Sequence, residues 1–356
     1  MLPALSVGRA IWNAKPESDI LFVGSRKPVD QETVEAAGFK FVGIPAGKLR
    51  RYFDWKNLAD SFQTVAGLVV ALSILIRFRP DKVFIKGGYV GVPVGVAAWM
   101  LRYPIILHES DSCVGLANRL LMPFSKWICV AFPINSYHLA KSTISKLIHT
   151  GIPLNEIFYQ PEIGNNIGIP FTEQKPFILI IGGSQGAQAI NQVIRKVLPD
   201  LVQDYQIFHI AGKTDFTELK QWAEEERFRG YYLFESLPNE QVAFLMRRSA
   251  VIISRAGATT IAEIAASSRP AILVPLPKSA GNHQLKNAEF LAAQGAAVMI
   301  EQAELTPEVL QERIFKILNS DLGPRLVFNI KQITQRDAAD KIAQLILSSN
   351  NSDSLN

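Results

Sequence analysis

The sequence predicts an α/β fold made of two domains, each built on a parallel β-sheet. Short apolar runs alternate with helix-length segments, and this alternation restarts after residue 155. Short buried strands joined by helical crossovers form parallel sheets. A chain of 356 residues is also long enough to bury two cores.

The strands follow one another at regular intervals. In the first half we expect them within residues 19–24, 82–88, 104–110 and 127–133. In the second half we expect them within residues 177–183, 205–212, 250–257, 270–276 and 296–300. The segment 149–170 between the two sets is rich in Gly, Pro and Asn and predicts the domain boundary.

One unit occurs twice. Residues 82–109 and 250–276 both run from a strand through a basic-plus-glycine turn, a helix and a proline to a second strand. Ligands of open α/β sheets bind beyond the carboxyl ends of the strands, where these glycine turns lie. We therefore expect two similar sheets facing each other across a cleft.

The composition is that of a globular protein, with 48% hydrophobic and 19% charged residues. A formal charge of +5 and a pI near 9.1 favour an anionic partner. Cys113 and Cys129 have neither metal-ligand nor disulfide spacing. We expect no signal peptide, and the longest apolar stretch, 65–76, is shorter than a membrane span of about 20 residues.

The turn Gly182–Gly186 runs from an apolar strand into a helix, a place that favours an anion. Its spacing is not that of a dinucleotide-binding loop, and Gly212-Lys213-Thr214 lacks the upstream glycine of a P-loop. The Ser184 hydroxyl can donate to a phosphate. The alternative, a glycine turn that only eases the chain into the helix, stays open.

Two further turns of the second half carry polar groups. Thr260 and Glu263 fit a capping box, which is the favoured interpretation in isolation, although Glu263 could instead accept from ribose hydroxyls. His283 and Gln284, in the loop 278–288, suit either sugar hydroxyls or solvent.

In the first half, Glu109 and Asp111 next to His108 indicate either an acid/base set or an ordinary acidic helix start. The sequence has no Asp-x-Asp pair and no zinc spacing.

Six segments in this order resemble the MurG family of bacterial peptidoglycan glycosyltransferases. They are PAGKLRRYFDW, KGGYVGVP, HESDSCVGLANR, GGSQGAQAIN, SRAGATTIAEIA and NHQLKNA. The resemblance implies the GT-B fold and inverting transfer of GlcNAc from UDP-GlcNAc to undecaprenyl-diphospho-MurNAc-pentapeptide (lipid I), forming lipid II. It also implies an acceptor domain over 1–154, a UDP-GlcNAc domain over 155–334, a returning helix over 335–349 and a disordered tail over 350–356.

The resemblance also implies the site, without a metal or a cofactor. Ser184 with Gly183 and Gln185 would hold the diphosphate, and Glu263 the ribose. His283, a variant where the family often has Gln, and Gln284 would meet the GlcNAc. The remaining positions matched to substrate-binding motifs are Asn191, Arg255, Ala258, Thr259 and Thr260 for the donor, and Tyr89, Glu109 and Asp111 near the acceptor, with Glu109 the catalytic candidate.

Two departures from the family pattern stand out. The family begins G-G-T-G-G-H-x-x-P-A-L, and this chain begins at the Pro-Ala-Leu, so we expect the first strand, the glycine loop and a candidate catalytic histidine to lie upstream of Met1. That strand would be central in the first sheet. Asn155 stands where the family has a nucleotide-contacting arginine, and Asp111 where Asn is commoner.

Residues 47–80 combine arginines and aromatic residues with a leucine-rich helix, which suits an anionic bilayer or, for 65–76, a core helix. With a lipid-linked acceptor, the resemblance favours peripheral association with the cytoplasmic face of the membrane, and no nucleic-acid partner. Two alternatives remain: another GT-B enzyme, such as a UDP-GlcNAc 2-epimerase or other lipid glycosyltransferase, and a non-catalytic sugar-nucleotide- or lipid-binding protein.

Overall fold

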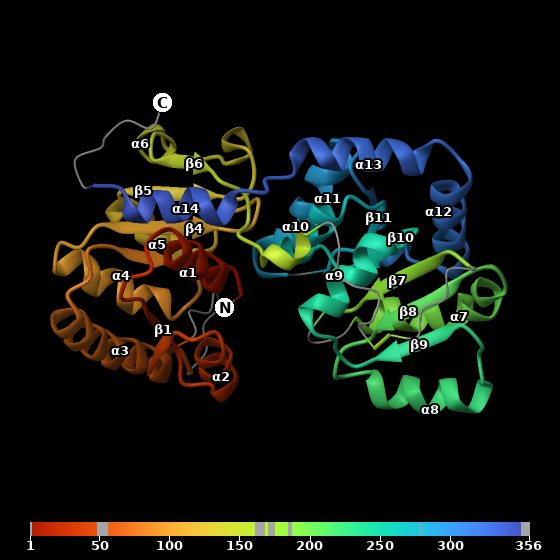
Figure 1. Cartoon of the computed structure of the whole chain (residues 1–356), viewed down its shortest axis with the longest axis horizontal. Helices are drawn as coiled ribbons and strands as arrows, with labels where there is room; N and C mark the ends of the chain where they lie inside the picture. The colour runs from red at the N-terminus through yellow and green to blue at the C-terminus, as the bar shows by residue number, and fades with distance from the viewer. Residues whose placement is uncertain are drawn as a thin grey trace. The chain divides into compact units, whose positions relative to one another are not determined.

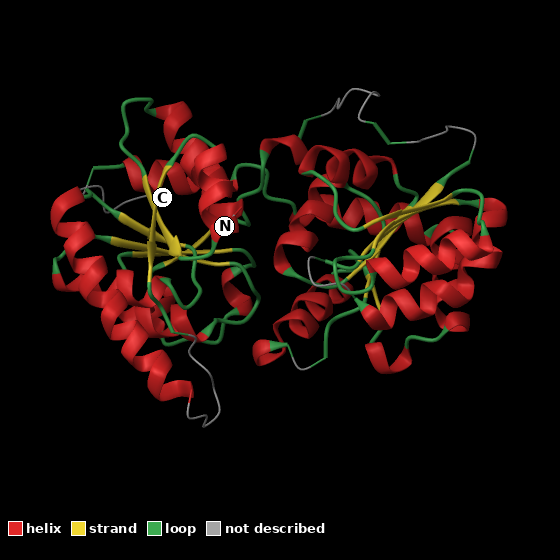
Figure 2. Ribbon diagram, turned by 90° about the horizontal axis from the view of Figure 1, so that it is seen from below, coloured by secondary structure: helices red, strands yellow, loops and turns green. Residues whose placement is uncertain are grey.

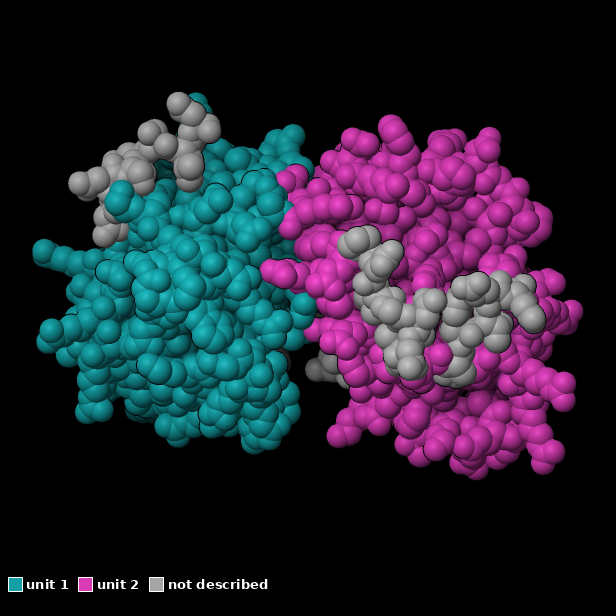
Figure 3. Space-filling model, in the orientation of Figure 1, with its two compact units in different colours: residues 1–155, 337–356 teal, residues 156–336 magenta. Residues whose placement is uncertain are grey.

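The computed structural model describes residues 2–47, 56–160, 168–169, 175–183, 187–277 and 279–349. It confirms the α/β fold with parallel strands, with helices on both sides of the strands in each half (Figures 1 and 2). The chain divides into unit 1, residues 1–155 with 337–356, and unit 2, residues 156–336 (Figure 3). That the two sheets face a common cleft stays a prediction.

Unit 1 alternates strands and helices along the chain. Its strands are β1 (Leu21–Ser25), β2 (Lys40–Ile44), β3 (Val83–Ile85), β4 (Ile105–Glu109), β5 (Trp127–Val130) and β6 (Leu147–His149). Its helices are α1 (Leu2–Ala14), α2 (Pro28–Ala36), α3 (Lys56–Phe78), α4 (Gly91–Met100), α5 (Leu116–Leu121), α6 (Lys141–Ile144), α14 (Ala338–Leu347) and the short 3-10 turns η1 (Met122–Phe124) and η2 (Ile134–Ser136).

The described strands of unit 1 form two sheets rather than one. β1 pairs with β2, and β3, β4, β5 and β6 pair in that order, all in parallel. Parallel neighbours bring the carboxyl ends of β3 and β4 to one edge, because Ile85 is opposite Leu107. The residues that follow Ile85 and Leu107 therefore lie close together.

The end of the chain completes the core of unit 1. α14 lies alongside α1 (Figure 1), and Ile342, Ala343 and Leu345 pack with Val7 and Ile11 over β4 and β5. Lys82 Nζ donates to the carbonyl of Leu345 at 3.0 Å and to the carbonyl of Ser348. A cation at these terminal carbonyls stabilises the helix end.

Unit 2 contains one six-stranded sheet. Its strands are β7 (Phe177–Ile181), β8 (Gln206–Ile210), β9 (Tyr231–Phe234), β10 (Val251–Ser254), β11 (Ala271–Leu273) and β12 (Val298–Met299). Its helices are α7 (Gln188–Asp204), α8 (Phe216–Glu226), α9 (Asn239–Arg248), α10 (Ala258–Ser267), α11 (His283–Ala293), α12 (Pro307–Asn319), α13 (Leu322–Ile333) and the 3-10 turns η3 (Glu156–Phe158), η4 (Ala280–Asn282) and η5 (Gln302–Glu304).

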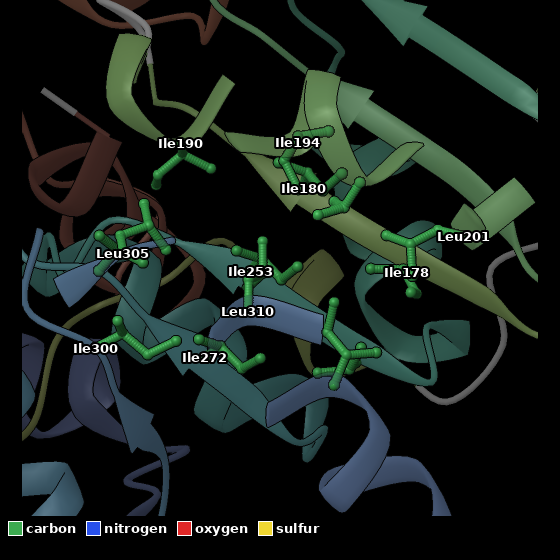
Figure 4. Close-up of a cluster of buried hydrophobic side chains, with 14 of the residues drawn as sticks. Ile178, Ile180, Ile190, Ile194, Leu201, Ile253, Ile272, Ile300, Leu305 and Leu310 are labelled. Carbon is green, nitrogen blue, oxygen red and sulfur yellow. The ribbon is translucent and has the colours of Figure 1, made fainter. Parts of the chain in front are cut away.

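The core of unit 2 is a layer of aliphatic side chains between the sheet and two helices. Ile178, Ile180 and Ile253 project from β7 and β10 against Ile190 of α7 and Leu310 of α12 (Figure 4). α7 buries residues 190, 194, 197, 198 and 201, the spacing of one helical face. These contacts fix where α7 begins, at the end of the turn that follows β7.

Candidate functional site

The strand order of unit 2 defines where a ligand is expected. The order is β12-β11-β10-β7-β8-β9. The chain adds β8 and β9 on one side of β7, and then adds β10, β11 and β12 on the other side. The crevice at such a change of direction, beyond the carboxyl ends of the strands, is the usual ligand site of an open α/β sheet. The turns after β7 and β10 flank it.

The turn after β7 is shaped by close backbone contact. Gly182 N–H donates to the carbonyl of Ile210 at 2.8 Å, and a Cβ on Gly182 would lie 2.8 Å from the carbonyl oxygen of Ala211. Gly183 has a φ of +79°, which favours glycine. α7 then begins behind Ala187 without a side-chain cap. Ser184 and Gln185, predicted to hold the diphosphate, lie outside the described residues.

The turn after β10 leads to a second helix start that no side chain caps. Gly257 is the N-cap of α10, so Ala258, Thr259 and Thr260 form its first turn. The capping-box interpretation was therefore wrong, because the N-cap is Gly257, three residues before Thr260, and Glu263 lies in the second turn. The lack of a cap is shared by α8, α9 and α13, whereas α12 is capped by the Thr306 hydroxyl, which accepts from Val309 N–H at 3.3 Å.

Glu263 has no hydrogen bond or ion pair within the described part of the chain. Its side chain is half-buried, and burial raises the pKa of its carboxyl to about 8. A half-buried carboxyl without a partner is costly to the fold, and it offers two acceptor oxygens to a ligand that brings hydroxyl groups.

Arg255 and Gln284 shape the loop after β11. Arg255 donates to the carbonyl of Val274 at 3.2 Å and to Gln302 Oε1 at 2.8 Å. Gln284 Oε1 accepts from Leu276 N–H at 3.0 Å, which leaves the Gln284 amide hydrogens available. Arg255 thus contacts protein groups rather than an open anion site. His283 is the first residue of α11, half-buried, and follows Asn282, the N-cap with a φ of +56°.

Three helices of unit 2 therefore start after the adjacent strands β7, β10 and β11; those of α7 and α10 have no side-chain cap, and in α11 the Gln284 N–H donates to Ser279 Oγ at 3.2 Å. Exposed N–H groups and the positive ends of the helix dipoles make such starts favourable for phosphate. Asn191, also predicted to bind substrate, is only 2% exposed and lies behind the first of these starts.

In unit 1, the loops after β3 and β4 bring two glycines and two carboxylates together. Gly87 and Gly88 have φ values of +102° and +86°, and a Cβ on Gly87 would lie 3.1 Å from Asn118 Nδ2. Tyr89 and Asp111 are half-buried in the two loops. Asn118 was not predicted; a polar residue between the apolar residues of a short helix was the available signal.

Glu109 organises the loop after β4. Its carboxylate accepts from Asp111 N–H at 3.1 Å, Gly115 N–H at 2.8 Å and Asn118 Nδ2 at 2.9 Å, and the residue is 4% exposed. Burial raises the pKa of its carboxyl, against the lowering effect of these donors. The three donors fix the carboxyl of Glu109 within the loop, and its assignment as the catalytic candidate stays a prediction.

His108 and Asn155 contribute less directly. His108 is fully buried, burial lowers its pKa to about 4, and Nε2–H of the neutral ring donates to the carbonyl of Gly151 at 2.9 Å. The Ser110 hydroxyl lies 3.2 Å from Nδ1. Asn155 is half-buried and is the last residue of the first segment of unit 1.

Comparison with known proteins gives a consistent result. Residues 1–130 match the glycosyltransferase family 28 N-terminal domain, and residues 177–345 match the family 28 C-terminal domain. The chain is 38% identical over 301 residues to the UDP-N-acetylglucosamine–N-acetylmuramyl-(pentapeptide) pyrophosphoryl-undecaprenol N-acetylglucosamine transferase of Clostridium botulinum strain Loch Maree, covering 83% of this chain and 82% of the relative. It is 35% identical over 340 residues to the enzyme of that name from Legionella pneumophila strain Paris, with 94% and 88% covered.

Solved structures share the fold. The crystal structure of Acinetobacter baumannii MurG matches with a TM-score of 0.74 at 26% identity, over 97% of this chain and 94% of that one. The UDP-GlcNAc 2-epimerase of Neisseria meningitidis, bound to UDP-GlcNAc, matches with a TM-score of 0.67 at 13% identity, over 98% and 96%. The second likeness shows the fold alone.

Proposed function

The chain belongs to the MurG family within glycosyltransferase family 28, and from this membership we propose how its residues perform the transfer. The reaction moves N-acetylglucosamine from UDP-GlcNAc to undecaprenyl-diphospho-MurNAc-pentapeptide and releases UDP. The anomeric bond to the diphosphate breaks as the bond to the acceptor hydroxyl forms, with inversion.

The observation that carries the proposal is the position of three helix starts, those of α7, α10 and α11, beyond the carboxyl ends of the adjacent strands β7, β10 and β11. Negative charge grows on the UDP diphosphate as the glycosidic bond breaks. Fixed N–H groups aimed at that charge stabilise the transition state without having to reorganise. In this proposal Gly183, Ser184 and Gln185 face the diphosphate together with the first turn of α10, Ala258 to Thr260.

The other donor contacts are assigned to polar side chains of the same loops and helix starts. The Glu263 carboxylate accepts from the two ribose hydroxyls, because it has no hydrogen bond within the described residues of the protein itself. His283 and the amide hydrogens of Gln284 meet the hydroxyls of the sugar. Arg255 acts indirectly, by holding the loop after β11 against α11. Asn155, in place of an arginine, makes a weaker contact with the nucleotide.

On the acceptor side, Tyr89 and Asp111 contact the acceptor or the transferred sugar, and Glu109 positions Asp111. The Glu109 carboxylate holds the Asp111 N–H, and the Tyr137 hydroxyl donates to the Asp111 carbonyl at 3.0 Å. These two bonds fix the backbone from which the Asp111 side chain projects.

The test is UDP release from UDP-GlcNAc in the presence and absence of a lipid I analogue. We expect release to depend on the analogue. At a pH of about 9, where a carboxyl with a pKa of about 8 is ionised, we expect Glu263→Gln to raise the KM for UDP-GlcNAc about 10-fold or more, because a hydrogen bond to a charged group is worth about 1.5–3 kcal/mol. Glu224→Gln, at an exposed carboxylate of unit 2, is the control. Unchanged donor KM in Glu263→Gln would contradict the assignment.

The second candidate, a UDP-GlcNAc 2-epimerase, shares the fold with this chain. An epimerase converts UDP-GlcNAc without an acceptor. Formation of the 2-epimer in the absence of the lipid I analogue would favour this candidate over the transferase.

We also propose that unit 1 associates peripherally with an anionic membrane surface, at the cytoplasmic face where the nucleotide-sugar is available. α3 buries Gly67, Ala71 and Leu75 on one side and exposes Phe62, Val65, Val69 and Ile76 on the other, followed by Arg77. Trp99 and Phe124 of the same unit are both exposed, and their ring centroids lie 4.6 Å apart. Exposed apolar side chains beside cations favour anionic lipid. No described helix is long and apolar enough to cross a bilayer. Within the predicted membrane-facing segment 47–80, residues 48–55 lie outside the described part of the chain.

A further inference from the structure

A chain of buried polar side chains lies directly behind the turn that follows β7. It joins Asp215 at the start of α8, Asn191 in the first turns of α7, His209 of β8 and Tyr231 of β9. Asn191, His209 and Asp215 are at most 8% exposed. Buried polar groups are costly unless they are paired, so each bond in the chain constrains its neighbours.

The chemistry of the four groups fixes the direction of every hydrogen bond. Asn191 Nδ2 donates to Asp215 Oδ2 at 2.7 Å, because the amide oxygen would be repelled by that carboxylate. Asn191 Oδ1 therefore faces His209 Nε2 at 2.9 Å and must accept from it. His209 thus carries its proton on Nε2.

The far end of the chain follows from the state of the ring. Burial lowers the pKa of His209 to about 3, so the ring is neutral and Nδ1 is an acceptor. Nδ1 lies 2.9 Å from the Tyr231 hydroxyl, which donates to it. The order of donation is Tyr231 to His209, His209 to Asn191, and Asn191 to Asp215.

This chain is in contact with the described ends of the β7 turn. Asn191 Nδ2 also reaches the carbonyl oxygen of Ala211 at 3.4 Å, and that oxygen is the atom a Cβ on Gly182 would strike. Gly182 N–H is bonded to Ile210, the residue after His209. Asn191 N–H is bonded to the carbonyl of Ala187, the N-cap of α7. A displacement of Asn191 or His209 therefore displaces both ends of the turn.

We propose that Tyr231, His209, Asn191 and Asp215 form a directed hydrogen-bond chain that positions Gly182 at the end of β7 and the start of α7 at Ala187 for the diphosphate of the donor. The four are positioning residues, because their polar atoms contact each other and the protein backbone. The inference rests on the proposed function, since it concerns the site for UDP.

The test compares two neighbouring tyrosines. Tyr231→Phe removes only the hydroxyl that donates to His209. Tyr232→Phe is the matched control, because Tyr232 lies on the same strand and is also half-buried. Its ring stacks on Phe208, with 4.8 Å between the ring centroids, and it is not a member of the hydrogen-bond chain. We expect Tyr231→Phe to weaken UDP binding and to raise the KM for UDP-GlcNAc about 3- to 10-fold, with the acceptor KM unchanged. We expect Tyr232→Phe to change neither.

The outcomes distinguish a failure of the proposed function from a failure of the positioning role. Calorimetry in which the unaltered protein does not bind UDP would overturn the proposed function, and this inference with it. Binding by the unaltered protein, with equal affinity in both variants, would overturn the inference alone. The nitrogen chemical shifts of His209 give a second readout that needs no variant: Nε2–H with unprotonated Nδ1 between pH 6 and 8 is expected, and the opposite tautomer would also overturn it.

Discussion

At the scale of single residues, Glu263 links the pH dependence of stability to the ligand site. The pKa of its carboxyl is about 8 in the folded protein because of burial, against about 4.5 in the unfolded chain. Between these values the folded state binds more protons than the unfolded state, so the free energy of unfolding falls as pH rises from about 5 to 8. The slope for one proton is at most about 1.4 kcal/mol per pH unit.

We predict that Glu263→Gln flattens this part of the pH profile and raises the Tm at pH 8, because the amide stays neutral and its burial leaves no charge desolvated. Thermal unfolding without ligand, at intervals from pH 5 to pH 8, measures the effect. Glu224→Gln should keep the slope of the unaltered protein, because its carboxylate is exposed and pairs with Lys220 at 3.9 Å. A slope that persists in Glu263→Gln would assign the titration to another group.

At the scale of elements, the pattern of the sequence predicted the strands better than the helix starts. The runs 177–183 and 250–257 contain β7 and β10, because a short apolar run that ends in a glycine turn marks a buried strand. The start of α10 was missed because Thr260 and Glu263 match a capping box by spacing alone, and the end of β10 at Ser254 decides where the helix begins. His209 was missed as well: a polar residue flanked by Phe208 and Ile210 within a buried strand was the available signal.

α3 illustrates an alternative that the sequence left open. Its residues fit both a core helix and a membrane-facing helix, and the structure shows one buried and one exposed side. We predict that the double substitution Val65→Glu and Val69→Glu abolishes flotation with vesicles rich in anionic lipid, because the carboxylates are repelled by the surface and unfavourable in its apolar layer.

The matched control for this prediction lies on another helix of the same unit. Val29 of α2 is 69% exposed, close to the 63% of Val69, so Val29→Glu adds a charge at an equally exposed position. Flotation should persist in Val29→Glu and weaken with added salt in the unaltered protein. Equal flotation of the Val65/Val69 variant and the Val29 variant would place the membrane contact elsewhere.

At the scale of the whole molecule, the chain leaves unit 1 after residue 155 and returns at residue 337. The restart of the strand pattern predicted two domains, whereas the returning helix came from the resemblance alone, because a short amphipathic helix carries no signal of which core it joins. That core is shared: Ile342, Ala343 and Leu345 pack with α1 over β4 and β5. Unit 1 thus depends on residues that are synthesised after all of unit 2.

This connectivity predicts that ending the chain at residue 336 destabilises unit 1 and leaves unit 2 folded. The truncation removes two fully buried large aliphatic side chains, Ile342 and Leu345, at roughly 1.5–3 kcal/mol each. It also removes the carbonyls that accept from Lys82. Calorimetry should show a low-temperature transition that UDP does not shift, followed by one that UDP raises, because a ligand stabilises only the unit that binds it. A chain ending at residue 349, which keeps α14, should unfold like the full chain. If both truncated chains unfold alike, α14 does not hold unit 1 together.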